Sequence, residues 1–334
     1  EKRWLMAGFR NILGHESEVE LLQKAVMLGK VSHAYIFEGE AGCGKKEIAE
    51  AFAMSLQCEK GAKDACMECT SCKQALTHNH PDIIYLTHEK PNTISVNDIR
   101  EQVNGDIYVK PYNGKYKVYL IEDAHKMNIQ AQNALLKTME EPPEYVVLIL
   151  LTNNAEGFLP TIRSRCVTIK MKPVQSGQII RYLMSRLNVS EKDAKMCASF
   201  AQGNIGKAAK LSASEDFNEM KDLAIQVMKR LKEMDLNEVV SAVRKINEYK
   251  LEAEDFLDLM MVWYRDILLL KATNDVNKLI FQDEVYDIKK AAATSSYEGL
   301  ELIMKGIEKA KKRIDANVNL ELVLELMLLT IKEN

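Results

Sequence analysis

A glycine-rich turn that joins an apolar run to a helical segment constrains this chain more than any other feature. The run Ala34–Phe37 is typical of a buried strand, and a helix is expected from about Lys45 to Leu56. The turn between them carries Gly39, Gly42, Gly44, Lys45 and Lys46. In this context a phosphate-binding loop is expected, with backbone N–H groups around the phosphates and Lys45 reaching the outer ones. A glycine-rich turn without a ligand is the alternative.

Position 46 departs from the phosphate-loop pattern. A hydrolysing site needs Ser or Thr here, because the hydroxyl group ligates Mg²⁺. The ammonium group of Lys46 cannot coordinate a metal ion, and within about 4 Å it would repel one by several kcal/mol. The backbone leaves ATP binding open, but metal-assisted hydrolysis is not expected.

A second acidic site follows the apolar run Val118–Ile121. Glu122 and Asp123 stand there in the order Glu then Asp, whereas an ATPase needs an Asp linked to Mg²⁺ followed by a Glu that polarises water. The reversal shifts each carboxylate by roughly 1.5 Å, which is enough to spoil a water-activating geometry. A helix cap is the alternative interpretation of this pair.

Four cysteines form a cluster directly after the expected helix. The spacing Cys58-x₇-Cys66-x₂-Cys69-x₂-Cys72 predicts a closed tetrahedral zinc site, which is structural rather than catalytic. An iron–sulfur cluster or free thiols are the alternatives. His78 and His80 could replace a cysteine, but surface positions are expected for both.

The order of elements predicts an α/β fold followed by an all-α region. Further apolar runs at 83–86, 146–151 and 167–169 alternate with helical stretches such as Ile129–Glu140, which implies a parallel sheet covered on both faces. Helical periodicity alone continues after about Lys172. We expect a phosphate-loop domain over residues 1–171 with its zinc module at 58–72, a small helical domain over 172–212, and a helical domain over 213–334. Glu1 to Leu5 are left out of this argument.

Composition narrows the class of protein. The net charge is −3 in 334 residues, so no global field favours DNA or a membrane surface. No apolar run reaches the length of a membrane span, and no leader pattern opens the sequence. A soluble, cytoplasmic protein is expected.

Several motifs, taken in order, resemble the AAA+ clamp-loader subunits of bacterial DNA polymerase III. They cover about Phe9 to Cys166. The motifs are Ile12-x-Gly14-His15, Ser32-His33-Ala34-Tyr35-x-Phe37, the four-cysteine module, Asn133-Ala-Leu-Leu-Lys137-x-x-Glu140-Glu-Pro-Pro143, Thr152-Asn153 and Ser164-Arg165-Cys166.

Two branches of this family share most of these motifs. The motor branch, gamma or tau, is expected to carry an intact phosphate loop and a sensor arginine in the small helical domain. This chain has Lys46, the inverted Glu122-Asp123 pair, and Gly203-Asn-Ile-Gly206-Lys207 at the sensor position. These departures favour the delta-prime branch, whose own nucleotide site is degenerate.

The resemblance also implies a role for Arg165. In such rings the arginine of the Ser-Arg-Cys motif projects onto the γ-phosphate of ATP in the neighbouring subunit, as an arginine finger. Arg163 is a weaker candidate, and a surface ion pair is the alternative for either. Thr152 and Asn153 match the first sensor position, or they satisfy the end of a strand.

By the same resemblance, the small helical domain is a lid and the last helices form the collar of a five-subunit ring. The implied partners are gamma or tau motors, the delta subunit, the sliding clamp and primed DNA at replication forks near the nucleoid, with no membrane. Wide apolar helices at Phe256–Leu270 and Leu320–Ile331 suit a collar, or the core of a monomeric bundle.

Three functions therefore remain open at this point. The first is a non-hydrolysing clamp-loader subunit that acts on its neighbour through Arg165. The second is a working ATPase in which Lys46 is tolerated. The third is a zinc-dependent nucleic-acid-binding protein. Position 46 argues against the second, and the near-neutral charge argues mildly against the third.

Overall fold

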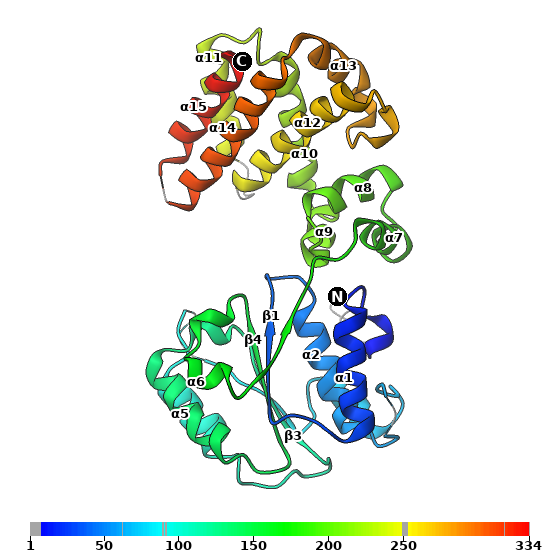
Figure 1. The fold of residues 1–334 in the computed structure, drawn as a ribbon, viewed down its shortest axis with the longest axis vertical. Helices are drawn as coiled ribbons and strands as arrows, with labels where there is room; N and C mark the ends of the chain where they lie inside the picture. The colour runs from blue at the N-terminus through cyan, green and yellow to red at the C-terminus, as the bar shows by residue number, and fades with distance from the viewer. Residues whose placement is uncertain are drawn as a thin grey trace. The chain divides into compact units, whose positions relative to one another are not determined.

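A parallel sheet and a set of helices form two compact units of the chain. The structure, a computed structural model, describes residues 8–61, 63–88, 90, 92–248, 253–316 and 318–333. One unit comprises Glu1–Gln178 with Gly203–Gly206, and the other comprises Ile179–Gln202 with Lys207–Asn334. Figure 1 shows that the first is built around the sheet and the second from helices. The expected α/β fold followed by an all-α region is confirmed.

The sheet has five parallel strands in the order β2-β3-β4-β1-β5. Their bounds are Ala34–Glu38 (β1), Ile83–Tyr85 (β2), Lys117–Ile121 (β3), Val146–Thr152 (β4) and Val167–Lys170 (β5). Each of the five apolar runs expected to be a strand is one of these strands.

Helices cover both faces of the sheet, which explains why its central strands are apolar throughout. On β4, Val147 and Ile149 belong to one core cluster, whereas Leu148 and Leu150 belong to the other. Figure 1 shows α1 and α2 on one face and α5 and α6 on the other. The helices of this unit are Glu16–Leu28 (α1), Lys45–Gln57 (α2), Thr70–Leu76 (α3), Val96–Ile99 (α4), Ile129–Glu140 (α5) and Pro160–Arg163 (α6), with a π-helical turn at Arg100–Asn104 (η2).

The parallel register brings the ends of three strands to one edge. Glu38 at the end of β1 pairs with Thr152 at the end of β4, and Ile121 at the end of β3 pairs with Leu150. The glycine-rich turn follows β1 and Glu122 follows β3. The predicted site residues of these segments therefore share the carboxyl edge of the sheet, where such sheets bind ligands.

Helices continue from α7 to the end of the chain, and no strand follows β5 within the described residues. They are Ser176–Leu187 (α7), Glu191–Phe200 (α8), Ile205–Ser212 (α9), Glu215–Arg230 (α10), Leu236–Glu248 (α11), Ala253–Thr273 (α12), Val285–Thr294 (α13), Tyr297–Asp315 (α14) and Leu320–Glu333 (α15). In α12, Phe256, Leu257, Leu259 and Met260 are fully buried. This helix contacts α10, α13 and α14, so its two apolar faces serve the core of the helical unit itself.

Helix α15 differs from α12 in how its apolar residues are used. Leu324 and Leu328 are fully buried, but Leu322 and Leu326 are 51% and 45% exposed. Among the helices of the described ranges, none combines the length and the apolar character that a membrane span requires.

A buried carboxylate fixes the loop that precedes β3. Asp82 is completely buried, and its side chain accepts hydrogen bonds from the backbone N–H groups of Tyr112 (2.6 Å), Asn113 (2.9 Å) and Gly114 (3.0 Å). Gly114 packs against the end of the Gln57 side chain, which would have to move if a larger residue stood at this position. Asp82 thereby ties the start of β2 to the start of β3.

We expect Asp82→Ala to lower the free energy of unfolding of the sheet unit by about 2–3 kcal/mol, because three backbone donors lose a charged acceptor. Urea denaturation followed by circular dichroism measures this change. Asp222→Ala, at an exposed position of α10, is the control and should stay within about 0.5 kcal/mol of the wild type. Equal stability of the two variants would contradict the role given to Asp82.

Candidate functional site

The glycine-rich turn has the backbone shape of a phosphate loop. Gly42 (φ 81°) and Gly44 (φ 99°) adopt left-handed conformations that disfavour other residues. A Cβ atom at Gly39 would stand 2.7 Å from Cys43 Sγ. Helix α2 begins at Lys45, so the helix N-terminus faces the loop as anion binding requires.

The lysine expected to reach phosphate oxygens is turned back onto its own loop. Lys45 Nζ donates a hydrogen bond of 2.9 Å to the carbonyl oxygen of Glu40. The backbone N–H of Cys43 donates to the same oxygen at 3.3 Å. Both donors therefore find their hydrogen-bond acceptor within the loop itself.

Three successive carbonyl groups of the loop accept hydrogen bonds from distant residues of the sheet unit. The carbonyl oxygen of Ala41 accepts from Asn204 Nδ2 at 2.8 Å, and that of Gly42 accepts from the N–H of Gly206 at 2.9 Å. The carbonyl oxygen of Cys43 lies 3.0 Å from His15 Nε2. The sequence did not predict these contacts, although His15 and the segment Gly203–Lys207 both belong to motifs described above.

Lys46 forms an ion pair with the carboxylate at the end of β3. Its Nζ atom lies 2.5 Å from Glu122 Oε1, and both side chains are about half exposed. Burial opposes the charge of Lys46, but pairing with Glu122 and the field of Glu50 and Glu47 outweigh it and raise the pKa of Lys46. The ammonium group therefore remains charged and neutralises the carboxylate that a metal ion would require.

The second acid of the reversed pair turns to a different partner. Asp123 lies 2.9 Å from Lys126 Nζ, and this hydrogen bond is the main reason that the pKa of Asp123 is lowered. Asp123 has a left-handed backbone (φ 47°) and starts a short 3₁₀ turn, but its side chain makes no capping hydrogen bond. Glu122 and Asp123 are thus both held by lysines.

Glu50, one turn along α2 from Lys46, is a buried acid that sequence reasoning missed. It is 4% exposed, and its Oε1 atom has no hydrogen-bond partner among the described residues. Burial raises the pKa of Glu50 to about 7, with Lys46 partly offsetting the effect. The available signal in the sequence was the position of Glu50 one helical turn after Lys46, which places the two side chains on the same face of α2.

The two residues of the first sensor position face different surroundings. Thr152 is completely buried, and its hydroxyl group donates to the carbonyl oxygen of Asn154 and accepts from the N–H of Asn154. Asn153 is exposed. Thr152 therefore satisfies the end of its own strand, which is the structural alternative expected for it.

Arg165 lies in the loop between α6 and β5 and is held at the surface. Its guanidinium group donates to the carbonyl oxygen of Thr161 (3.0 Å) and to Glu140 Oε1 (3.2 Å). The side chain is 35% exposed, whereas Arg163 is exposed without such a pair among the described residues. Burial raises the pKa of the neighbouring thiol of Cys166 to about 12.

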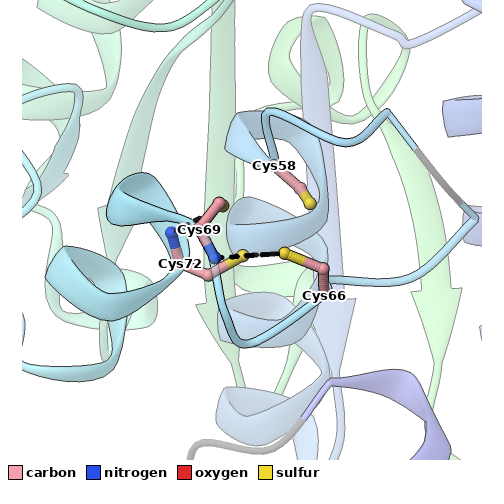
Figure 2. A group of neighbouring side chains, drawn as sticks. All are labelled: Cys58, Cys66, Cys69 and Cys72. Atoms are coloured by element: carbon pink, nitrogen blue, oxygen red, sulfur yellow. Dashed lines mark hydrogen bonds between the residues drawn. The ribbon is translucent and has the colours of Figure 1, made fainter.

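The four clustered cysteines converge on one point. Their sulfur atoms all lie within 4.8 Å of one another, and Figure 2 shows the side chains directed into a common space. Cys66 Sγ and Cys72 Sγ are 3.9 Å apart, close to the roughly 3.8 Å edge of a tetrahedron with 2.3 Å zinc–sulfur bonds. These four residues could hold a metal ion.

Backbone N–H groups favour the thiolate form of Cys66, whereas burial raises the pKa of Cys72. The N–H of Cys69 points to Cys66 Sγ at 3.3 Å, and that of Cys72 points to Cys69 Sγ at 3.4 Å. The N–H groups of Cys69 and Glu68 lower the pKa of Cys66 to about 6. Thiolate is the form that binds a metal ion.

The two histidines after the cluster differ from each other. His78 is exposed, as expected, and lies against the ring of Tyr85. The surface position expected for His80 is wrong: it is 4% exposed, and its Nε2 atom lies 2.9 Å from Ser71 Oγ. Its Nδ1 accepts from the N–H of Asp82, so Nε2 carries the proton and donates to Ser71. His80 therefore joins α3 of the cysteine module to the sheet.

The buried acid Glu50 predicts a pH dependence. The pKa of Glu50 is 4.5 in the unfolded chain and about 7 in the folded one. Between these two pH values the unfolded chain loses the proton of Glu50 while the folded chain keeps it, so the free energy of unfolding falls as the pH rises. We expect Glu50→Gln to flatten this part of the stability profile and to raise stability at pH 8 by about 1–3 kcal/mol. Urea denaturation at several pH values measures both effects.

The exposed Glu144 provides the matched control. Glu144→Gln should follow the wild-type profile throughout this pH range. If Glu50→Gln also follows it, the proton on Glu50 does not contribute to stability.

Comparison with known proteins places the chain among replication proteins. A family described as "DNA polymerase III, delta subunit" matches residues 14–175, and one described as "DNA polymerase III, delta subunit, C terminal" matches residues 216–333. A solved gamma subunit-related protein of DNA polymerase III from Thermotoga maritima has 18% sequence identity and a TM-score of 0.42, over 94% of this chain and 98% of that one.

Two curated relatives align over nearly their whole length. DNA polymerase III subunit delta' of Bacillus subtilis is 30% identical over 94% of this chain and 95% of its own. DNA polymerase III subunit gamma of Buchnera aphidicola (Schizaphis graminum) is also 30% identical, over 98% of this chain and 96% of its own. These matches show that the chain belongs to the clamp-loader subunits of DNA polymerase III.

Proposed function

We propose that this chain is the delta-prime-type subunit of its clamp loader: it does not hydrolyse ATP itself and stimulates the adjacent motor subunit through Arg165. In the assembled complex it would help load the sliding clamp onto primed DNA at replication forks in the cytoplasm. Its neighbours would be gamma or tau subunits and the delta subunit in a ring of five. The ion pair between Lys46 and Glu122 carries this proposal.

Two requirements of a hydrolysing site are not met at this ion pair. Lys46 stands where a hydroxyl group would ligate Mg²⁺, and its ammonium group neutralises the carboxylate of Glu122 at 2.5 Å. A divalent ion would have to displace this pair and then face the charge of Lys46 at short range. Lys45, bonded to its own loop, offers no compensating charge in this arrangement.

The sensor position supports the same conclusion. The segment Gly203–Lys207 stands where a motor subunit would carry its sensor arginine, and within it the N–H of Gly206 donates to the carbonyl oxygen of Gly42. The next residue, Lys207, forms ion pairs with Asp255 (3.4 Å) and Asp258 (3.3 Å) of the helical unit. Neither residue presents a free cation for a γ-phosphate.

The surroundings of Arg165 support its use by a neighbouring subunit. The guanidinium group is partly exposed, and its two partners are an exposed carboxylate and a backbone carbonyl. An exposed ion pair contributes about 0–1 kcal/mol, so its release costs little. A planar, permanently charged group of this kind can stabilise the transition state of phosphoryl transfer by about 10³–10⁵ in rate.

Two further parts of the chain would serve assembly and stability. The four-cysteine group would hold one structural zinc ion, because all four ligand positions are filled by the chain. The exposed Leu322 and Leu326 of α15 would pack against other subunits in a collar, which would remove their apolar surface from water.

An ATP-hydrolysing motor is the second candidate. The equal similarity to a gamma subunit and the presence of Gly39, Gly42, Gly44 and Lys45 favour it. It requires Lys46 to leave Glu122 when metal-bound nucleotide arrives. Hydrolysis by the isolated chain distinguishes the two candidates directly.

We expect the isolated chain to show no Mg²⁺-dependent ATP hydrolysis. In the reconstituted complex, Arg165→Ala should remove the contribution of the adjacent motor site, where an arginine finger is worth about 10³–10⁵ in rate. Steady-state ATPase assays with primed DNA and clamp measure both outcomes. Size-exclusion chromatography establishes that the variant still assembles.

Arg163→Ala is the matched control, because Arg163 lies two residues away and is also exposed. It should retain full DNA-stimulated activity. The proposal fails if the purified chain turns over ATP, or if the two arginine variants behave alike.

For the cysteine group we expect about one zinc ion per chain in protein that has never met a chelator. Cys69→Ser should lose most of the metal, because one of four thiolate ligands is gone. Cys166→Ser, which lies outside the group, should keep it. Elemental analysis by mass spectrometry measures the ratio, and wild-type protein without metal would refute a structural zinc site.

A further inference from the structure

Three residues hold the outside of the phosphate loop, and we call them the clasp: His15, Asn204 and Gly206. They engage three carbonyl oxygens in succession, those of Cys43 (3.0 Å), Ala41 (2.8 Å) and Gly42 (2.9 Å). His15 and Asn204 are 7% and 8% exposed, so water competes little for these hydrogen bonds.

The clasp fixes the orientation of the peptide units in the loop. A trans peptide is planar, with its C=O and the following N–H pointing in opposite directions. Holding three carbonyl groups therefore also fixes the directions of the N–H groups that follow them. Lys45 Nζ and the N–H of Cys43 both donate to the carbonyl oxygen of Glu40, which adds two contacts within the loop itself.

The contact at Gly206 has room for glycine only. A Cβ atom there would stand 2.7 Å from the carbonyl oxygen of Gly42 and 2.8 Å from its Cα. Gly203, at the start of the same segment, has φ 93°, and a Cβ atom there would lie 2.4 Å from Pro173 Cβ. Its carbonyl oxygen also accepts from the N–H of Val174 at 2.9 Å. The segment is thus tied down at both ends.

We propose that the clasp takes the place of nucleotide in holding the phosphate loop folded. The loop then keeps one conformation whether or not ATP is present, and His15, Asn204 and Gly206 act as positioning residues. This inference rests on the proposed function and deepens it, because a subunit that stimulates its neighbour benefits from a loop that does not change during the ATP cycle.

Hydrogen exchange of the full chain, followed by mass spectrometry, tests the clasp. We expect Asn204→Ala to speed exchange in the segment 39–46 by about threefold to tenfold, as the loss of one buried hydrogen bond predicts. Gly206→Ala should have a larger effect, because the added Cβ atom pushes the segment off the loop. Exchange in β4 (Val146–Thr152) serves as the internal reference.

Gly157→Ala is the matched control, since a Cβ atom there meets nothing within 4 Å; it should leave exchange in the loop unchanged. The ratio of exchange in the loop to exchange in β4 decides the test, so a variant that loosens the whole unit still gives a result. The proposal is overturned if neither clasp variant raises this ratio, or if Mg-ATP strongly protects the loop of the wild-type chain.

Hydrolysis assays keep this test separate from that of the proposed function. If the chain hydrolyses ATP, the proposed function fails whatever the exchange rates are. If it does not hydrolyse ATP and the clasp variants exchange like the wild type, only the clasp is wrong.

Discussion

The ion pair between Lys46 and Glu122 sets the balance of charge at the carboxyl edge of this sheet. In a metal-dependent NTPase this edge gathers negative charge, which a divalent ion neutralises. Here a covalently attached ammonium group supplies the neutralising charge at 2.5 Å, so the edge is balanced without an ion. The neighbouring acids have causes of their own: burial raises the pKa of Glu50 to about 7, and Asp123 pairs with Lys126.

The fold could be predicted from sequence because its three central strands are buried on both faces. A strand such as β4, apolar at every position from Val146 to Leu151, is typical of a parallel sheet that helices cover on both sides. The place of the glycine-rich turn between β1 and α2 and the convergence of the four cysteines could be predicted for a related reason, since each draws its key residues from one short segment. The spacing of these residues along the segment then determines most of their arrangement in space.

The remaining parts of the site depend on contacts between segments far apart in the chain. Asn204 and Ala41 are separated by 163 residues, and no periodicity in either segment points to the other. The burial of His80 depends in the same way on Ser71 and Asp82, which reach it from a helix and a strand end. The surface position expected for His80 was wrong because its place in the sequence, after the cysteine group, reveals neither of these contacts.

The cysteine group is part of the main core rather than an appended module. Cys58, Cys72 and Ala75 belong to the same apolar cluster as Phe52 of α2 and Val118 of β3. Loss of a metal ion from such a group would therefore disturb packing in the sheet unit as well as the loop that carries the thiols.

The tight contact at Gly206 also limits how such a chain could change over time. Any side chain at position 206 must displace the backbone of Gly42, and with it the turn that leads into α2. Position 206 and the turn therefore cannot vary independently, because a larger residue at one is tolerated only with a shift of the other. We expect the two segments, 163 residues apart in the chain, to change together among related sequences.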